Sequence, residues 1–345
     1  MIEVGLVGFG LAGRAFHAPV IRAVPGLHLA AILERSGTEA AEKYPDVRIV
    51  RTLDELLSMS EIRLIVIATP NETHHLFARQ CLEAGRDVIV DKPFTATLKE
   101  AVSVVQFAKD ADRLLTVYQN RRYDGDFQAI RKLVETGTLG RIVRFETSYD
   151  RFRPQLKSGA WRESARPGSG ILFDIAPHLI DHALVLFGLP DAVTADVRTE
   201  RESAADDAFD IMLHYPNAMR AVLRSSILAA APRPRFVLFG TEGSFVKQTF
   251  DPQENNLRRS YIPSAGAWGA EPEENWGVLT VPKGDSFEQW RIPSATCDYR
   301  DYYSNVRDVL LGRAALAVTP EYALDVMRML ELARESSQKR CTIPW

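Results

Sequence analysis

Short aliphatic runs alternate with helical patterns along the first third of the chain. The runs have strand length and are apolar on both faces. Strands of this kind are typical of a parallel sheet that helices cover on both sides. The pattern therefore predicts a doubly wound α/β domain over residues 1–120. Its expected strands are residues 2–8, 27–33, 64–70, 87–93 and 114–120, and its expected helices are residues 53–58, 73–85 and 98–111.

The pattern changes after residue 141, where longer strands alternate polar and apolar positions. Turn signals such as YPNA and GTEG join several of them directly, which favours a mostly antiparallel, open-faced sheet. We therefore expect a second, α+β domain over residues 121–345, in which residues 251–294 form long surface loops. Its expected strands are residues 142–150, 192–199, 207–216, 219–228 and 235–248, and its closing helices are residues 300–312 and 320–337.

Composition narrows the classes of protein that fit. The 345 residues are 46% hydrophobic and 25% charged, which indicates a globular chain long enough for two domains. A net charge of -3 gives no sign of a nucleic-acid partner. Three separated cysteines without a CxxC pair favour a reduced compartment and no metal site. The amino terminus shows no signal segment and no apolar run approaches about 18 residues, so we expect a cytoplasmic protein with no membrane partner.

A glycine-rich segment, GLVGFGLAG, follows the first predicted strand. Gly8, Gly10 and Gly13 have G-x-G-x-x-G spacing before a helix, which predicts a dinucleotide site. The first glycine allows a tight turn, the second lets the backbone approach a pyrophosphate, and the third lets helix and strand pack closely. Pro19 predicts a short first turn, a kink or a break in the helix that follows. The expected loop also includes Phe9, Leu11 and Ala12.

The residues after the second predicted strand bear on which nucleotide binds. Glu34 lies about twenty residues beyond the glycine motif, where a carboxylate accepts hydrogen bonds from the ribose hydroxyls and repels a 2′-phosphate. This position favours NAD. Arg35 and Ser36 leave NADP open, because a guanidinium and a hydroxyl are groups that bind a 2′-phosphate. A solvated loop charge is an equally good interpretation of Arg35.

Two further segments place ionisable groups in apolar surroundings. The sequence DKP sets Lys92 at the end of an apolar strand, where burial of an ammonium costs several kcal/mol unless something compensates it. Asp174 is followed by His178 at i+4 and Asp181 at i+7, so the three would share one face of a helix. A polar line beside an apolar one is also common on surface helices. For the neighbouring His182 a structural role is favoured.

Together, GFGLAG, DKPF, QNRRYDGDF, YDRFRP and PHLIDHAL resemble the glucose-fructose oxidoreductase and inositol dehydrogenase (Gfo/Idh/MocA) family over essentially the whole chain. The resemblance is strongest to a bacterial branch that includes NADP-linked scyllo-inositol dehydrogenases. It implies a Rossmann domain over residues 1–120, a substrate-binding and oligomerisation domain over residues 121–345, and a homodimer or larger assembly. It also implies an NAD(P)-dependent dehydrogenase or reductase of a cyclic polyol, sugar or sugar derivative. The alternatives are a non-catalytic NAD(P)-binding sensor and a glycosidase-like enzyme that uses bound NAD.

The resemblance also implies roles for individual residues. Lys92 matches the lysine of the family's E-K-P motif, with Asp91 in place of the commoner glutamate. Asp174 and His178 match the family's catalytic aspartate and histidine, so His178 is expected to transfer a proton and Lys92 to stabilise alkoxide charge. The further cofactor residues expected are Thr69, Asn71, His74, Asp91, Lys92, Gln119, Asn120 and Arg122. The expected substrate residues are Lys92, Tyr123, Asp150, Arg153, Trp161, Asp174 and His178, with Lys157 as a further candidate.

Overall fold

The computed structural model describes residues 1–156, 163–263, 268–296 and 298–345, and it divides into two compact units. Unit 1 comprises Met1–Asn120, Gln253–Trp268 and Asp298–Met327. Unit 2 comprises Arg121–Pro252, Gly269–Cys297 and Arg328–Trp345. The first break lies at residue 120. A single later domain over residues 121–345, expected from the sequence, differs from this division, because two later segments pack with the first unit.

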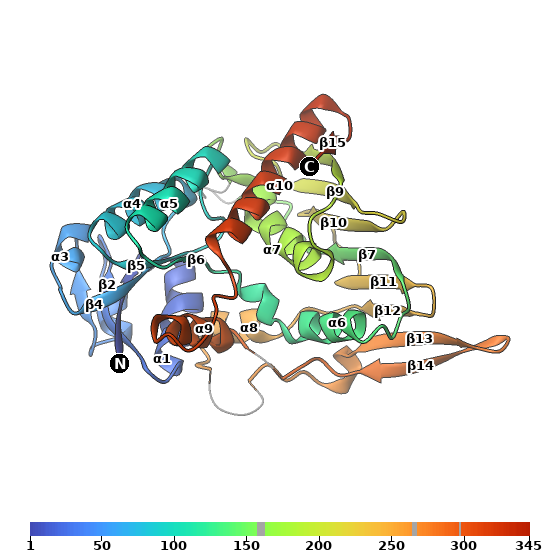
Figure 1. The fold of residues 1–345 in the computed structure, drawn as a ribbon, viewed down its shortest axis with the longest axis horizontal. Coiled ribbons are helices and arrows are strands. Elements are labelled where there is room, and N and C mark those ends of the chain that lie inside the picture. The colour runs from blue at the N-terminus through green and yellow to red at the C-terminus, as the bar shows by residue number, and fades with distance from the viewer. Residues whose placement is uncertain (157–162, 264–267, 297) are drawn as a thin grey trace. The chain divides into compact units, whose positions relative to one another are not determined.

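Unit 1 contains a six-stranded parallel sheet with the order β3-β2-β1-β4-β5-β6 (Figure 1). Its central strands are almost entirely buried, which confirms the doubly wound α/β architecture expected from the apolar runs. The strand order reverses between β1 and β4, and such sheets bind ligands at the carboxyl ends of the strands near that point. The strands are β1 (Ile2–Val7), β2 (Leu27–Leu33), β3 (Arg48–Val50), β4 (Ile62–Ile67), β5 (Asp87–Val90) and β6 (Leu115–Val117).

The helices of unit 1 come from both ends of the chain. Helix α4 packs against α5, and α1 packs against the late helix α9. Thr97 starts α5 with a capping box, since its hydroxyl accepts from the amide of Glu100 and the Glu100 carboxylate accepts from the amide of Thr97. The helices are α1 (Ala18–Ala23), α2 (Glu39–Lys43), α3 (Leu53–Leu57), α4 (His74–Glu83), α5 (Leu98–Asp110), α8 (Gln253–Arg258) and α9 (Arg300–Leu310).

The helix after the glycine loop begins with a π-helical turn, η1 (Ala12–His17), and continues as α1. The amide of Ala18 donates to the carbonyl of Gly13, five residues earlier. Pro19 has no amide to donate to the carbonyl of Ala15, so the wider turn accommodates it. Pro19 was expected to cause a short turn, a kink or a break. The structure shows instead a change from π-helix to α-helix at Ala18.

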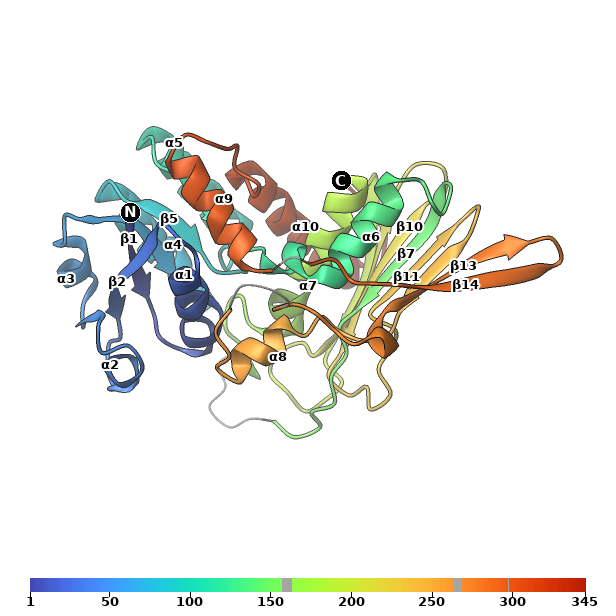
Figure 2. The same ribbon diagram turned by 90° about the horizontal axis from the view of Figure 1, so that it is seen from below.

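Unit 2 is built on a nine-stranded sheet with the order β14-β13-β12-β11-β7-β10-β9-β8-β15. Among the described residues its strand pairs are antiparallel except β7 with β10, which confirms the mostly antiparallel α+β prediction. Helices α6 (Gly125–Glu135) and α7 (Gly170–Phe187) lie on one face of it (Figure 2), and α10 (Pro320–Lys339) is the last helix. The strands are β7 (Ile142–Ser148), β8 (Ala192–Arg198), β9 (Ala208–His214), β10 (Arg220–Ser226), β11 (Phe236–Gly240), β12 (Ser244–Lys247), β13 (Gly277–Lys283), β14 (Ser286–Ile292) and β15 (Ile343–Pro344).

Residues 251–294 were expected as long surface loops, and this prediction is wrong for much of the segment. Strands β13 and β14 form a hairpin that extends beyond the rest of the sheet (Figure 1), with Gly284 at its turn in the left-handed region, φ +57°. Pro282 lies inside β13, and most side chains of β14 are exposed, so the segment lacks the usual alternation of a strand. Proline is tolerated there because Pro282 pairs only with Phe287 of the edge strand.

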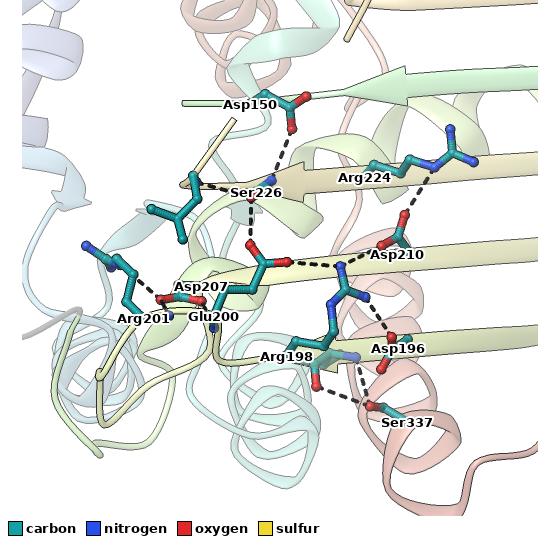
Figure 3. Close-up of polar contacts among 12 residues, drawn as sticks. Asp150, Asp196, Arg198, Glu200, Arg201, Asp207, Asp210, Arg224, Ser226 and Ser337 are labelled. Carbon is teal, nitrogen blue, oxygen red and sulfur yellow. Dashed lines mark hydrogen bonds and ion pairs between the residues drawn. The ribbon is translucent and has the colours of Figure 1, made fainter. Parts of the chain in front are cut away.

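The open face of this sheet carries charged side chains across strands β7 to β10. Arg224 lies 2.8 Å from Glu146 and 3.1 Å from Asp210. Arg198 binds Asp210 at 2.8 Å and Asp196 at 2.7 Å (Figure 3). The side chains of these two arginines and their three acidic partners are all at least partly exposed. This part of the face is therefore covered by alternating, paired charges rather than by apolar side chains.

Helix α7 is the most apolar helix of unit 2. Among the described residues it is the one helix long and apolar enough to cross a membrane, with a mean hydropathy of 1.5 over Gly170–Phe187. The expectation concerned uninterrupted apolar runs, and Asp174, Asp181 and two histidines do interrupt α7, but its mean hydropathy remains high. Since 78% of the segment is buried inside the protein, α7 is a core helix by its surroundings.

Candidate active site

The loops after five strands of the parallel sheet carry most of the residues expected to bind a nucleotide. Gly8 follows β1, Glu34 follows β2, Thr69 follows β4, Asp91 follows β5 and Gln119 follows β6. Because these strands are parallel, their carboxyl ends lie along one edge of the sheet. The structure thus brings these positions to a single edge of unit 1. Asn71, His74, Lys92 and Asn120 lie in the same loops or directly after them.

The backbone of the glycine loop has the shape that a pyrophosphate site requires. Gly8 has φ +99°, and a Cβ added there would lie 2.6 Å from the carbonyl oxygen of Ala68. A Cβ on Gly13 would lie 2.1 Å from the carbonyl oxygen of Gly8, whereas one on Gly10 would meet nothing within 4 Å. The first and third glycines are therefore required by packing, and the second leaves the loop open to an approaching phosphate. Of the other loop residues, Phe9 is buried, Ala12 is half-buried and Leu11 is exposed.

The carboxylate of Glu34 is engaged by its own surroundings. It accepts a hydrogen bond from the amide of Ala40 at 3.3 Å, and its Oε2 lies 3.5 Å from Nη1 of Arg51. Arg51 also donates to the carbonyl of Glu34 at 2.7 Å. Glu34 is 8% exposed, whereas Arg35 and Ser36 are exposed. Pairing with Arg51 reduces the repulsion that Glu34 would exert on a 2′-phosphate.

His74 links two of the strand-end loops. Its Nδ1 lies 2.9 Å from the carbonyl oxygen of Pro93, and its Nε2 lies 2.9 Å from that of Thr69. The ring is fully buried, and burial lowers its pKa although the charge of Asp91 opposes this. His74 therefore joins the loops after β4 and β5, where Asn71 is also buried.

Asp91 and Lys92 form the end of β5. The Asp91 carboxylate accepts from the amide of Lys92 at 2.9 Å, and its Oδ1 lies 3.6 Å from Nε2 of His17. Burial raises the pKa of Asp91, but the nearby His17 and the charges of Lys92 and His74 outweigh burial and lower it. Asp91 is thus an anion beside the half-buried Lys92, which supplies the compensation that a lysine in this place needs.

Helix α7 places Asp174, His178 and Asp181 on one face, as their spacing requires. His178 is 4% exposed and Asp181 is 1% exposed, while 20% of the Asp174 side chain is accessible. Nε of Arg122 donates to both oxygens of Asp181 at 2.9 Å, and Nη1 of Arg151 lies 3.5 Å from Asp174. Arg122, expected at the cofactor, is therefore an ion-pair partner of α7.

A cavity of about 80 Å³ lies beside Asp174 within unit 2. Basic and acidic side chains share its wall with Ile171 and Ile227, so it offers donors and acceptors beside an apolar part. A wall of this mixed kind can bind a hydroxylated ligand. The charged lining residues include Arg151, Arg153, Glu163, Asp174, Arg201 and Asp206.

The start of α7 is fixed by a residue from the loop between β8 and β9. Asp206 accepts from the amide of Leu172 at 2.7 Å through its side chain, and from the amide of Ile171 at 2.9 Å through its carbonyl. Burial raises the pKa of Asp206, and the hydrogen bond from Leu172 opposes that effect. Gly170 has φ +88°, and a Cβ there would lie 2.3 Å from the Asp206 carboxylate. The turn that precedes Asp174 is therefore closely held.

The structure assigns different surroundings to the expected substrate residues. The side chain of Asp150 is fully buried and accepts from the amide of Ser226 at 3.0 Å and from Nε and Nη2 of Arg233 at 2.8 and 2.6 Å. Because its lone pairs are used, we propose no substrate contact for Asp150. Arg153 lines the cavity, Tyr123 is half-buried in the short helix η3 (Asn120–Tyr123), and Lys157 and Trp161 lie outside the described residues.

Two residues near Asp91 were missed by the sequence interpretation. His17 is fully buried at the end of the π-helical turn, and its Nδ1 lies 2.6 Å from the hydroxyl of Tyr303 on α9. A histidine within the apolar segment AFHAPVI and a tyrosine pair in RDYYSNV were the available signals. Neither matches a motif, so their proximity emerges only in the fold.

No group of three or more His, Cys, Asp or Glu side chains suited to a metal ion occurs in the described part of the chain. The two described cysteines are free, with Cys81 buried and Cys341 exposed. Burial raises the pKa of the Cys81 thiol to about 12. Cys81 is therefore an uncharged core residue rather than a reactive thiol.

Comparison with known proteins agrees with this geometry over the whole chain. Residues 2–119 match the model of the oxidoreductase family with an NAD-binding Rossmann fold, and residues 127–246 match the GFO/IDH/MocA C-terminal domain. The oxidoreductase YdgJ of Escherichia coli (strain K12) is 41% identical over 343 residues, which are 99% of this chain and 98% of the relative. The scyllo-inositol 2-dehydrogenase (NADP(+)) IolW of Bacillus subtilis (strain 168) is 36% identical, with 99% and 95% covered. The solved structure of the oxidoreductase yvaA from Bacillus subtilis has a TM-score of 0.95 at 36% identity and covers 100% of this chain and 98% of that one.

These matches confirm the expected enzyme class and the use of NAD or NADP. They include segments of both units. The Gly8–Gly13 loop fits a dinucleotide, because Gly8 and Gly13 are closely packed and Gly10 is open to an approaching phosphate. When bound, such a nucleotide supplies a hydride acceptor or donor for the reaction. The chain is therefore an NAD(P)-dependent oxidoreductase and belongs to the Gfo/Idh/MocA family.

Proposed function

We propose that the protein interconverts a secondary alcohol and a ketone of a cyclic polyol, sugar or sugar derivative in the cytoplasm. The observation that carries this proposal is the placement of His178 and Asp174 one turn apart on α7, the most apolar helix of unit 2. Ionisable side chains are costly in such surroundings unless they are paired or used in chemistry. The charged residues that line the cavity beside Asp174, and the activity for which the relative IolW is named, support a hydroxylated substrate.

Each of the three catalytic candidates has a distinct task. Oxidation of a secondary alcohol removes a proton from the hydroxyl and a hydride from the same carbon. His178 takes the hydroxyl proton, and Asp174 orients the imidazole and stabilises its charged form. The ammonium of Lys92 stabilises negative charge on the substrate oxygen, and reduction of a ketone uses the same groups in reverse.

Of the two nucleotides, we propose NADP as the better ligand, against the preference for NAD that the position of Glu34 suggested. Arg51 pairs with the Glu34 carboxylate, and the exposed Arg35 and Ser36 follow it in the chain. A guanidinium and a hydroxyl there can bind a 2′-phosphate, while Arg51 partly offsets the charge of the acidic group that would repel it. The relative IolW, which is named for its use of NADP(+), supports this choice.

A substrate panel tests the reaction. Purified protein is mixed with inositols, aldoses and ketosugars in the presence of each nucleotide, and the absorbance of reduced nicotinamide is followed. We expect turnover with at least one polyol or sugar, and His178→Ala should lower that turnover by about 10²–10⁴-fold while the nucleotide still binds. His214→Ala is the matched control, because His214 lies on β9 and hydrogen bonds to Thr194 of β8. Near-normal turnover by folded His178→Ala would remove the proton-transfer assignment.

Two further substitutions separate the remaining roles. Lys92→Met should lower turnover through lost stabilisation of charge on the oxygen. Asp174→Asn keeps the shape of the side chain and should lower turnover less than His178→Ala does, since it only weakens the orientation of the imidazole. Product formation without net reduction of nicotinamide would instead indicate a transient-oxidation enzyme, and nucleotide binding without turnover on any panel member would indicate a sensor.

We also propose that the protein self-associates through the open face of the nine-stranded sheet. Phe239 of β11 lies beside Arg144 on that face and is 42% exposed, while the paired charges of β7 to β10 continue the surface. An exposed aromatic side chain beside paired positive and negative charges is a surface that can associate with the same surface of a second copy.

A further inference from the structure

We propose that His17 is a positioning residue for Lys92 and that it acts through Asp91. Tyr303 fixes the orientation of His17 through a hydrogen bond to its other ring nitrogen. The inference rests on the role of Lys92 in the proposed function. Three contacts within unit 1 form the series. The Tyr303 hydroxyl lies 2.6 Å from Nδ1 of His17, Nε2 of His17 lies 3.6 Å from Oδ1 of Asp91, and the same Oδ1 accepts from the amide of Lys92 at 2.9 Å.

The His17 imidazole has a fixed orientation. It is 0% exposed, its ring lies 4.4 Å from that of Tyr118, and Tyr303 meets it edge-on at 6.3 Å. Aromatic walls of this kind leave little room for the ring to rotate. The two ring nitrogens therefore keep their directions, one toward a phenol and the other toward a carboxylate.

The partners also decide which nitrogen carries the proton. Burial raises the pKa of Tyr303 well above its usual range, so the phenol stays protonated and donates to Nδ1. An ionised Asp91 only accepts, so Nε2 of His17, which faces that carboxylate, is the donor of this pair. The series thus runs in one direction, from the Tyr303 hydroxyl through His17 to Asp91.

The contact between His17 and Asp91 is longer than an ordinary hydrogen bond. Nε2 of His17 is buried and has no hydrogen-bond partner within the usual distance. A closure of about 0.5 Å would bring it into the normal N–H···O range. Since buried polar atoms are nearly always satisfied, the arrangement favours movement of the Asp91 loop toward His17.

The position of His17 connects this contact to the nucleotide site. His17 ends the π-helical turn that starts at Ala12, directly after the open part of the glycine loop, and Gly13 in that turn packs on Gly8. One imidazole therefore links the segment that receives a pyrophosphate to the loop that carries the catalytic lysine. Binding of the nucleotide should close the His17–Asp91 contact and order Lys92.

The decisive variant is Tyr303→Phe, which removes one hydroxyl and keeps the ring. Tyr302→Phe is a matched control, because Tyr302 is the preceding residue of α9, packs against Tyr118 and Tyr303, and directs its hydroxyl to Thr116 at 3.3 Å instead. We expect Tyr303→Phe to lower kcat about tenfold with little change in KM, since misplaced catalytic groups cost turnover more than binding. Tyr302→Phe should change kcat less than about twofold.

Hydrogen exchange provides a readout that does not depend on a substrate. The peptide spanning residues 88–96 is followed with and without NADP in the unmodified protein and in both variants. We expect NADP to slow exchange of this peptide in the unmodified protein and in Tyr302→Phe, and to slow it clearly less in Tyr303→Phe. His17→Gln, which keeps a donor for Asp91, should retain more of the protection than His17→Leu does.

The proposal would be overturned if the two tyrosine variants lost kcat equally and lost thermal stability equally. The contacts of His17 would then serve packing alone. Unchanged NADP protection in Tyr303→Phe would overturn it as well. If the unmodified protein turns over no panel substrate, the proposed function fails, yet the exchange experiment still decides whether His17 orders the loop. Should His17→Leu not fold, Tyr303→Phe carries the test alone.

Discussion

Three of the four buried histidines lie outside the proposed proton transfer, and their partner atoms distinguish them. His17 lies between a phenol and a carboxylate, whereas His74 lies between two backbone carbonyls. His182 stacks on Phe127 at 4.2 Å and contacts the carbonyl of Arg121 at 3.2 Å. The structural role expected for His182 agrees with this packing. A histidine in an apolar segment is therefore interpretable only once its neighbours are known.

His182 gives stability a dependence on pH. Burial and then the charge of Arg235 lower its pKa well below the ordinary value, so the native ring stays neutral. Below about pH 6.5 the unfolded chain binds a proton that the native ring does not, and the free energy of unfolding falls as the solution is acidified. Between pH 7.5 and 5.5 this contribution is on the order of 1 kcal/mol. His182→Gln should reduce the acid-induced loss by about that amount in denaturant titrations at the two pH values. An unchanged difference would contradict the assignment.

The choice of nucleotide is also decided by single side chains. Arg35→Ala should weaken NADP about tenfold or more and leave NAD nearly unchanged, because a charge-assisted hydrogen bond to a 2′-phosphate contributes about 1.5–3 kcal/mol. Arg113→Ala is the control, since Arg113 is another exposed arginine of unit 1, beyond α5. Calorimetric titration with both nucleotides measures the effect. Tighter binding of NAD by the unmodified protein, with no response to Arg35→Ala, would restore the preference that Glu34 suggested.

At the scale of elements, α7 depends on a residue outside itself. Asp206 takes the place of an N-terminal cap, and Gly170 gives it room. Asp206→Ala should lower the free energy of unfolding by about 1 kcal/mol, the usual contribution of such a cap. Glu202→Ala is the control, since Glu202 is an exposed acid of the same loop. Equal stability of the two variants would show that the contact does not hold the helix.

The elements were predictable where a local pattern specifies them. Buried parallel strands appear as apolar runs, and Gly8, Glu34, Thr69 and Asp91 each follow the carboxyl end of such a strand. The β13–β14 hairpin was missed since its exposed side chains show no alternation. The contact of His17 with Tyr303 spans 286 positions, and no periodicity relates residues so far apart. The parts of the site that depend on such contacts emerge only from tertiary packing.

At the scale of the whole molecule, self-association is the feature most open to test. Phe239→Glu places a charge on the open face of the sheet, and we expect it to shift sedimentation at micromolar concentration toward a monomer. Leu311→Glu is a matched control, because Leu311 is 44% exposed, compared with 42% for Phe239, and belongs to unit 1. A monomer already in the unmodified protein, or equal effects of both substitutions, would contradict pairing through this face.

The composition of unit 1 from distant segments has a consequence for synthesis. The core around β6 needs late residues, since the Thr116 hydroxyl donates to the carbonyl of Val318 at 2.7 Å and Tyr303 meets His17. Arg307 on α9 likewise donates to the carbonyl of Pro25 at 2.7 Å. A ribosome makes the chain from its amino terminus, and domains usually fold as they emerge. We therefore expect the nucleotide domain to complete its core only after residues beyond 318 have emerged, with apolar side chains near β6 exposed until then.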